Sequence, residues 1–390
     1  MRIPLFYTWR SLWTRRVTTL LTLGGFALVV FVFAAVLMLA NGLEHALVET
    51  GADDNAIVVR KASTSEVTSQ IGRDAVSVIE THPEVAQLPD GKPLASAEVY
   101  VLINLAKRGS GDMGNVTVRG VSPGVVALRP QVRIVAGRIF GFGSNEIIVG
   151  ANIAKRFEGT EVGKTLRFGA KDWTIVGHFA AGNTAFESEI WGDLEQFLPA
   201  FGRRSTLSTL TFRLRSPQNF EAAKNRIAQD PRTQAYDLKR ERDFYREQSK
   251  VMATFITIMG MIVTVIFSLG AVIGAMITMY AAVANRTVEV GTLRALGFRR
   301  RSVLGAFLVE AVLLACLGAA AGLGLAALTS FIRISTMNWG SFSELAFGFA
   351  LSPQVVLAAF LFAIVMGIVG GFLPAVRAAR LDIVTALRVS

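Results

Sequence analysis

Long runs without a charged side chain divide the sequence into membrane-spanning and water-exposed parts. Residues 17–43, 251–285 and 345–376 contain no Asp, Glu, Lys or Arg, and residues 302–332 contain only Glu310. A helix of about 20 apolar residues crosses the roughly 30 Å hydrocarbon core of a bilayer. The pattern therefore predicts four spans, at residues 17–43, 251–284, 304–331 and 353–376.

Residues 44–250 have the pattern of a folded domain outside the bilayer. Charged residues recur throughout this segment, and short alternating stretches are separated by glycines, as is typical of strands. We expect strands at residues 57–60, 98–105, 116–121, 146–149, 165–168, 173–176, 209–215 and 235–238, and helices at residues 65–81, 218–228 and 242–250. The simplest assembly is a porter-like α+β subdomain made from both ends of the segment, with a β-rich subdomain inserted at about residues 123–207.

The predicted fold is thus an α-helical membrane protein with one span, an α+β periplasmic domain and three further spans. Residues 1–16 are predicted to form an amphipathic helix on the membrane surface. Residues 285–303 form a cytoplasmic loop, residues 332–352 a periplasmic loop and residues 377–390 a cytoplasmic tail. The helix at 242–250 is expected to run unbroken into the second span, giving a stiff rod between the loop and the domain.

Composition and charge agree with a membrane protein and give its orientation. The chain is 52% hydrophobic and only 18% charged, which excludes a soluble protein of ordinary composition. Residues 1–16, 285–303 and 377–390 together hold twelve basic residues and two acidic ones. By the positive-inside rule both termini and the loop are cytoplasmic, and the large domain is periplasmic. The net charge of +11 is therefore a consequence of topology, and we expect no nucleic-acid binding.

The sequence predicts no catalytic, cofactor or metal site. His45, His82 and His178 have no metal-ligand spacing, and Cys316 is the only cysteine. Residues 159–165 resemble a phosphate-binding loop but have three residues between the two glycines, whereas that loop needs four. We expect a β-turn there.

Glu310 is an ionisable side chain inside a predicted span. Such a group must face protein or water. We expect a structural or coupling ion pair with Arg286 or Arg294, and a proton relay is the alternative.

The loop from Asn285 to Phe298 is the most specific local pattern. It predicts a short amphipathic helix with Val290, Leu293 and Leu296 on one side and arginines around them. Such a helix is suited to docking on a soluble partner. The alternative is a basic loop that touches anionic lipid.

This loop resembles that of the MacB/FtsX-like permeases of ABC transporters, which typically reads Arg-x-x-Glu-Ile-Gly-x-Leu-Arg-Ala-Leu-Gly. With Val290 in the isoleucine position, the residues that the resemblance predicts for ATPase coupling are Arg286, Glu289, Val290, Gly291, Leu293, Arg294, Ala295, Leu296 and Gly297. Phe307-x-x-Glu310, the segment from Gly371 to Ala379 and the segments around Gly137 and Gly150 also match. Ile383 departs from the family pattern, which has proline there.

The resemblance implies a type VII permease that works by mechanotransmission in a bacterial inner membrane and lacks its own ATPase. Two copies, or one copy and a paralogue, would pair with a dimer of cytoplasmic ABC ATPase subunits. Those subunits would bind ATP and Mg²⁺, with no cofactor in this chain. The implied output is export of a lipid, lipoprotein, peptide or hydrophobic drug, passed to a membrane-fusion adaptor and outer-membrane channel or to a lipoprotein carrier. The alternative is a regulator that activates a cell-wall hydrolase or a sensor kinase.

Overall fold

The computed structural model describes residues 16–383 of the chain, and these form two compact units. We call residues 16–42, 254–332 and 349–383 the helical unit, and residues 43–253 and 333–348 the outer unit. The helix predicted for residues 1–16, apart from Arg16, and the tail beyond residue 383 lie outside the described residues.

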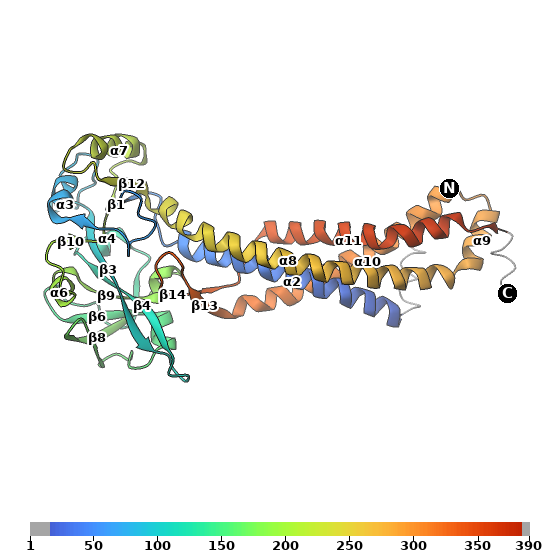
Figure 1. The fold of residues 1–390 in the computed structure, drawn as a ribbon, viewed down its shortest axis with the longest axis horizontal. Coiled ribbons are helices and arrows are strands. Elements are labelled where there is room, and N and C mark those ends of the chain that lie inside the picture. Colours follow the sequence, from blue (N-terminus) through green and yellow to red (C-terminus); the bar gives the residue numbers. More distant parts are fainter. Residues whose placement is uncertain (1–15, 384–390) are drawn as a thin grey trace. The chain divides into compact units, whose positions relative to one another are not determined.

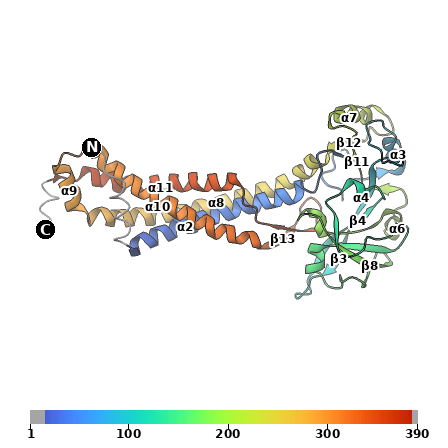
Figure 2. The same cartoon turned by 180° about the vertical axis from the view of Figure 1, so that it is seen from behind.

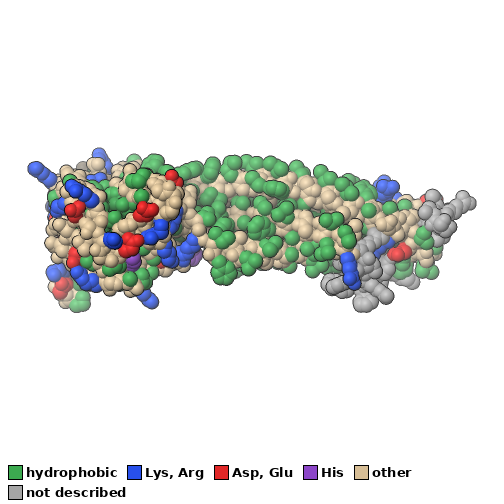
Figure 3. Space-filling view, turned by 90° about the horizontal axis from the view of Figure 1, so that it is seen from below, with side chains coloured by type: hydrophobic (Ala, Val, Ile, Leu, Met, Phe, Trp, Pro, Cys, Tyr) green, Lys and Arg blue, Asp and Glu red, His purple; other side chains and the backbone are tan. Residues whose placement is uncertain are grey.

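The helical unit contains the four predicted spans, each a helix long and apolar enough to cross a membrane. They run side by side in both Figure 1 and Figure 2. The helices are α2 (Arg16–Val48), α8 (Glu241–Ala284), α10 (Arg300–Leu328) and α11 (Pro353–Arg380). The short helix α9 (Thr287–Ala295) lies in the loop between α8 and α10, and the 3-10 turn η3 (Thr329–Phe331) follows α10. In Figure 3, hydrophobic side chains cover the middle of this unit.

Glycines at four-residue spacing allow α10 to pack closely on its neighbours. A Cβ atom on Gly322 would lie 2.4 Å from the carbonyl oxygen of Ala27 in α2, a backbone atom that cannot move aside. On α11, a Cβ atom on Gly371 would lie 2.4 Å from the Cβ of Ala311. Small residues at such positions let membrane helices approach and gain dispersion contacts. The small-xxx-small patterns of α10 and α11 are therefore used within this chain.

The span α8 is much less covered than the others. Only 11% of its most apolar window is buried, against 44%, 44% and 39% for α2, α10 and α11. It approaches α2 at Gly260, where a Cβ atom would meet the side chain of Val36, and at Thr278, whose hydroxyl accepts a hydrogen bond from Thr22 at 2.8 Å. Most of the apolar surface of α8 therefore faces away from the helices of its own chain.

The outer unit is built on one twisted sheet of ten strands. Its first half comprises β1 (Asn55–Arg60), β3 (Ala95–Ala106), β4 (Met113–Val121), β11 (Thr209–Arg213) and β12 (Tyr236–Arg240). Its second half comprises β5 (Arg133–Gly137), β6 (Glu146–Gly150), β7 (Thr165–Phe168), β8 (Lys171–Ala180) and β9 (Glu189–Asp193). The strand order is β12-β1-β11-β3-β4-β9-β6-β8-β5, with β7 on β8. A parallel pair, β4 with β9, joins the two halves, and Val118 lies opposite Ile190.

Short elements cover this sheet and complete its core. They are α3 (Arg73–Glu80), α4 (Val125–Leu128), α5 (Ala151–Arg156), η1 (Ala185–Ser188), α6 (Leu194–Ala200), η2 (Pro217–Asn219) and α7 (Phe220–Gln229), with the two-residue pair β2 (Ile71–Gly72) and β10 (Thr206–Leu207). Buried aromatic rings fill the inserted half, where Trp173 lies 4.5 Å from Phe197 between ring centroids. The same hydrophobic cluster continues under the first half. Residues 123–207, the predicted insertion, therefore do not form a separate subdomain. They share the ten-stranded sheet and its hydrophobic core with the rest of the outer unit.

One local prediction for the outer unit is wrong, and one predicted loop contains an element that was not predicted. The helix expected at 65–81 begins only at Arg73, because the two residues before it, Ile71 and Gly72, form the strand β2 and pair with β10. The loop expected at 332–352 contains an antiparallel hairpin, β13 (Arg333–Met337) with β14 (Glu344–Gly348). Each of these strands has only five residues and lies next to an apolar span. The hydrophobic pattern of the sequence therefore does not distinguish them from the loop.

Candidate functional site

The loop helix α9 ends at a glycine that its backbone geometry requires. Gly297 has φ of +92°, a region that glycine enters without a steric penalty. Its N–H donates to the carbonyl of Arg294 at 3.1 Å, and the N–H of Phe298 donates to the carbonyl of Leu293 at 3.2 Å. These two bonds form the common glycine-terminated helix end. The family-matching glycine therefore sets where α9 stops and the chain turns toward α10.

Two arginines tie α9 to the other helices. The Nη1 of Arg286 lies 2.9 Å from the carboxylate of Glu310 on α10, and both side chains are less than 10% exposed. Arg294 donates to the carbonyl of Leu381, just after α11, at 2.6 Å. Of the two partners that the sequence offered for Glu310, the structure therefore selects Arg286. A displacement of α9 must move or break these contacts.

One face of α9 is buried and the other is open. Val290 is 3% exposed and packs in a cluster with Val283 of α8, Phe307 of α10 and Ala375 of α11. Arg286, Val290 and Arg294 follow each other at four-residue spacing and thus share one helix face. Leu296 is 67% exposed. The sequence predicts Val290, Leu293 and Leu296 on one exposed apolar side. The structure instead buries Val290 in the core of the helical unit and exposes Leu296.

The open surface of α9 combines short apolar and polar side chains. Its exposed members are Val288, Glu289, Thr292, Ala295, Leu296 and Gly297, while Leu293 and Arg294 are half-buried and Arg286, Val290 and Gly291 are buried. The residues predicted for ATPase coupling thus lie in α9 and in the residues at its two ends, with different tasks available to its two faces. The inner face fixes α9 to the spans, and the outer face is exposed.

A network of buried charges in the outer unit was missed from the sequence. Arg119 on β4 contacts three carboxylates: that of Glu98, that of Glu189 at 2.7 Å and that of Glu66 at 3.1 Å. Arg129, after α4, contacts the second oxygen of Glu98 at 2.8 Å. All of these side chains are at most 4% exposed. Burial disfavours the charged guanidinium, but the attraction of Glu189, Glu98 and Glu66 outweighs it and raises the pKa of Arg119 well above its ordinary value.

This network holds the first turns of α8. Glu241 lies 3.4 Å from Arg129 and accepts hydrogen bonds from Asn55 at 2.9 Å and from the Ala52 N–H at 3.0 Å. One turn further on, the Tyr245 hydroxyl donates to Glu66. Breaking one partner of a buried ion pair costs about 3–5 kcal/mol. The helix that continues as the second span is therefore firmly attached to the outer sheet.

A weak signal for this network exists in the sequence. Glu98 and Arg119 lie in two consecutive apolar strands, and in the hairpin register Tyr100 is opposite Arg119. Opposite charges on neighbouring strands indicate a pair. The signal does not show that the pair is buried, since the other partners, Glu66, Glu189 and Glu241, come from distant parts of the chain.

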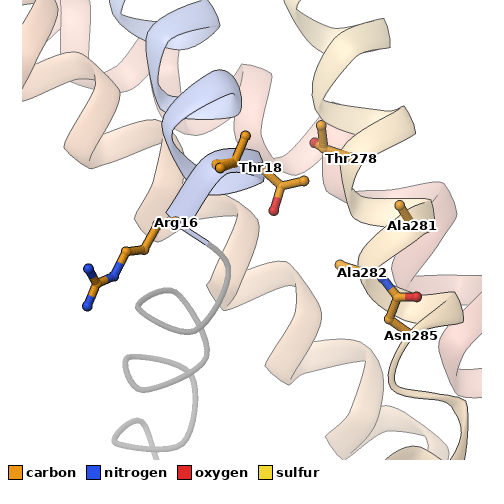
Figure 4. A pocket seen from close by; sticks show the side chains of 7 residues that line it. Arg16, Thr18, Thr278, Ala281, Ala282 and Asn285 are labelled. Carbon is orange, nitrogen blue, oxygen red and sulfur yellow. The ribbon is translucent and has the colours of Figure 1, made fainter.

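Two connected hollows follow the α2–α8 side of the helical unit. The first, of about 420 Å³, lies between Arg16 and Thr18 at the start of α2 and Thr278 and Asn285 at the end of α8 (Figure 4). The second, of about 360 Å³, shares Thr278 and is lined by Gly25, Gly270 and Gly274. A Cβ atom on any of these three glycines would meet nothing within 4 Å. Among the described residues, a third glycine pair at four-residue spacing, Gly270 and Gly274, thus has no helix packed closely on it.

Comparison with known families decides the classification. Residues 19–230 match the family model described as the MacB-like periplasmic core domain, and residues 261–383 match that of the FtsX-like permease C-terminal region. The chain belongs to the MacB/FtsX-like family of ABC transporter permeases. The resemblance seen in the loop and span motifs is thereby confirmed, and the four-span protein carries the extracytoplasmic domain of this family.

Several curated proteins are similar to this MacB/FtsX-like permease. The "Uncharacterized ABC transporter permease YknZ" of Bacillus subtilis is 29% identical over 293 residues, covering 70% of each chain. The "Macrolide export ATP-binding/permease protein MacB" of Photorhabdus laumondii is 24% identical, over 98% of this chain and 60% of that protein. The "Pyoverdine export ATP-binding/permease protein PvdT" of Pseudomonas fluorescens is 38% identical, over 39% of this chain and 22% of that protein. This chain thus spans only part of the length of the two export proteins.

Two solved structures resemble part of the chain. The first is the extracellular domain of YknZ from Gram-positive bacteria, with 14% identity and a TM-score of 0.36; the match covers 47% of this chain and 99% of that chain. The second is the periplasmic region of MacB from Actinobacillus actinomycetemcomitans, with 8% identity and a TM-score of 0.38; the match covers 48% of this chain and 89% of that chain.

Proposed function

We propose that this permease converts ATP hydrolysis by a separate cytoplasmic ABC ATPase dimer into a conformational change of its outer unit. The observation that carries the proposal is the two-faced helix α9. Its inner face is fixed to α10 and to the end of α11 by Arg286 and Arg294, while Leu296 and its neighbours are exposed. Such a helix passes force from a docked partner to the spans. ATP and Mg²⁺ would be bound by that partner.

The orientation that this proposal needs follows from charge. The basic residues near the ends of the spans support an orientation with both termini and α9 in the cytoplasm and the outer unit in the periplasm, across a bacterial inner membrane. The test is thiol labelling in a Cys316→Ala background. An impermeant reagent should label Ser110→Cys in intact spheroplasts and Thr292→Cys only after the membrane is opened. The reverse pattern would overturn the orientation.

The α2–α8 side is the surface that we propose to pair with a second copy or a paralogue. Its support is the low coverage of α8 and the open glycines Gly270 and Gly274, which allow another helix to approach closely. Ile273 on α8 and Leu357 on α11 are both exposed, at 56% and 62%. Oxidative cross-linking between copies should occur for Ile273→Cys and fail for Leu357→Cys. Equal cross-linking of both would contradict this seam.

The output that we propose is export from the periplasm or the outer leaflet of a lipid, lipoprotein, peptide or hydrophobic drug. Two relatives are named for macrolide and pyoverdine export, which supports an export role for this family member. A membrane-fusion adaptor with an outer-membrane channel, or a lipoprotein carrier, would receive the cargo.

The deciding experiment targets the open face of α9. Tagged permease is purified from native membranes in mild detergent, and the retained ATPase is identified and its activity measured. Leu296→Asp should lower retention and stimulated ATP hydrolysis by about tenfold or more, as loss of a central apolar contact does. Val126→Asp, an exposed position of the outer unit, is the matched control and should change neither. Full ATPase retention by Leu296→Asp would refute the docking role of α9, and retention of a wall hydrolase or a kinase instead of export components would favour a regulator.

A further inference from the structure

The hairpin β13–β14 is attached to the rest of the outer unit through two charged side chains, Glu344 and Arg333. Glu344 is 12% exposed and lies between Lys107, after β3, and Arg156 of α5, which it contacts at 3.0 Å. Gly114 makes room for this group, because a Cβ atom there would lie 2.8 Å from the Glu344 carboxylate. Hydrogen bonds to charged groups are the stronger ones in proteins. Glu344, with its two cationic partners, is therefore one of two ionic attachments of the hairpin. The other is Arg333, which lies 3.7 Å from Glu187 of η1 and 3.3 Å from the Asn152 side chain.

Further contacts hold the hairpin in the same position. The Asn115 side chain donates to the carbonyl of Phe342 at 2.9 Å, and the N–H of Ala346 donates to the Ser188 hydroxyl at 3.2 Å. Phe342 itself has φ of +56°, an unfavourable conformation for a bulky side chain. The tip of the hairpin thus keeps its shape because contacts to β4 and η1 over-determine it.

Beneath this tip lies a small polar cavity. Its volume is about 20 Å³, which is room for one water molecule. Asn338, Ser341 and Ser343, in the turn between β13 and β14, line it on one side. On the other side it is lined by members of the buried charge network and of α8, namely Glu66, Tyr100, Glu189, Tyr245 and Gln248.

We propose that the hairpin is a lid, latched by Glu344, that keeps water away from the charge network attaching α8 to the outer sheet. With the lid closed, Arg119 and its carboxylates interact in a medium of low permittivity. With the lid open, bulk water enters the cavity and weakens the attraction between Arg119 and its carboxylates. Water also competes with the Tyr245 hydroxyl for hydrogen bonding to Glu66. Because the hairpin connects α10 to α11 in the chain, a pull on these spans would loosen the attachment of α8.

This inference takes its meaning from the proposed mechanotransmission, but its test needs no ATPase. Hydrogen–deuterium exchange is measured on the purified full-length protein in detergent. Glu344→Gln should accelerate exchange about tenfold, the effect of losing a charged hydrogen-bonded partner, both in residues 333–348 and in residues 241–250. Glu161→Gln is the control, because it removes an exposed ion pair with the neighbouring Arg108 and should leave both segments unchanged.

A disulfide across the lid gives a second, reversible measurement. Ser188→Cys with Ala346→Cys, in a Cys316→Ala background, should pin the hairpin shut when oxidised. In the Glu344→Gln protein this bond should restore slow exchange in residues 241–250, and dithiothreitol should reverse the effect. Faster exchange of the hairpin with unchanged residues 241–250 would overturn the lid, and no change in either segment would overturn the latch. Neither outcome bears on ATPase docking, which is tested at Leu296.

Discussion

The carboxylate of Glu310 on α10 lies 2.9 Å from the Nη1 of Arg286, the residue that precedes α9. Both side chains are nearly buried in the helical unit, at 9% and 8% exposure. The pair therefore holds the start of the proposed coupling helix against a span. It explains why an ionisable residue occurs inside an otherwise uncharged run.

Loss of this pair should destabilise the helical unit. Glu310→Gln leaves the Arg286 charge without its partner, and a broken buried pair costs about 3–5 kcal/mol. We expect a lower thermal midpoint of the purified permease. The double variant Arg286→Glu with Glu310→Arg, which swaps the two charges, should recover part of that midpoint. Glu289→Gln, whose side chain is 56% exposed at 3.8 Å from Arg286, should cost less than about 1 kcal/mol. Equal midpoints for Glu310→Gln and Glu289→Gln would contradict the assignment.

The buried network should dominate the stability of the outer unit. Arg119→Met removes the guanidinium shared by Glu66, Glu98 and Glu189, and we expect a loss of about 3–5 kcal/mol. Tyr245→Phe removes one donor to a carboxylate and should cost about 1–3 kcal/mol. Denaturant unfolding followed by tryptophan fluorescence measures both losses. An Arg119→Met protein as stable as the parent would show that the network contributes nothing.

Close packing of α10 on α2 should be disturbed by a side chain at Gly322 but not by one at Gly324. Gly322→Val places side-chain atoms against the Ala27 carbonyl, whereas a Cβ atom on Gly324 meets nothing within 4 Å. Overpacking of this kind costs typically about 1–3 kcal/mol. Size-exclusion chromatography and thermal midpoints should therefore show a damaged Gly322→Val protein and a nearly normal Gly324→Val protein. The opposite order would be incompatible with this helix contact.

The stability of the inserted half should fall in acid because of Glu146. Hydrogen bonds from Arg138, and from the Gly141 N–H, lower the pKa of Glu146 to about 2. Since the folded pKa is below the unfolded one, the stabilisation is present above the unfolded pKa of about 4.3 and is lost as pH falls toward 2. Arg138 is 61% exposed, so solvent screening limits the effect to about 1 kcal/mol or less. Unfolding measured between pH 5 and pH 2 should show a smaller acid dependence for Glu146→Gln, and identical curves would count against the pair.

The four spans and the order of the units were predictable because bilayer thickness imposes a length on every uncharged run. The ion pair of Glu310 was predictable for a similar reason, since a charge inside a span needs a partner. Periodicity could not tell which face of α9 is buried. Its nine residues make few turns, and Val290 is buried by contacts from three other helices.

The charge network and the hairpin were beyond sequence reasoning for a different reason. Charged residues in strands ordinarily indicate a solvent-facing side, and only the folded sheet brings Arg119 to Glu66, Glu189 and the first turns of α8. Glu344 similarly meets Lys107 and Arg156, which precede it by more than 180 residues. Tertiary contacts between distant segments decide these features, and the local pattern indicates only that Glu98 and Arg119 lie on neighbouring strands.

The most direct test of mechanotransmission follows the outer unit while nucleotide acts on the other side of the membrane. Hydrogen exchange of the permease in complex with its ATPase is compared without nucleotide and with ATP and Mg²⁺. The account predicts that ATP changes exchange in residues 241–250 and 333–348 of the outer unit, and that Leu296→Asp abolishes this response. Exchange in the outer unit that is the same with and without ATP, in a complex that hydrolyses it, would contradict the account.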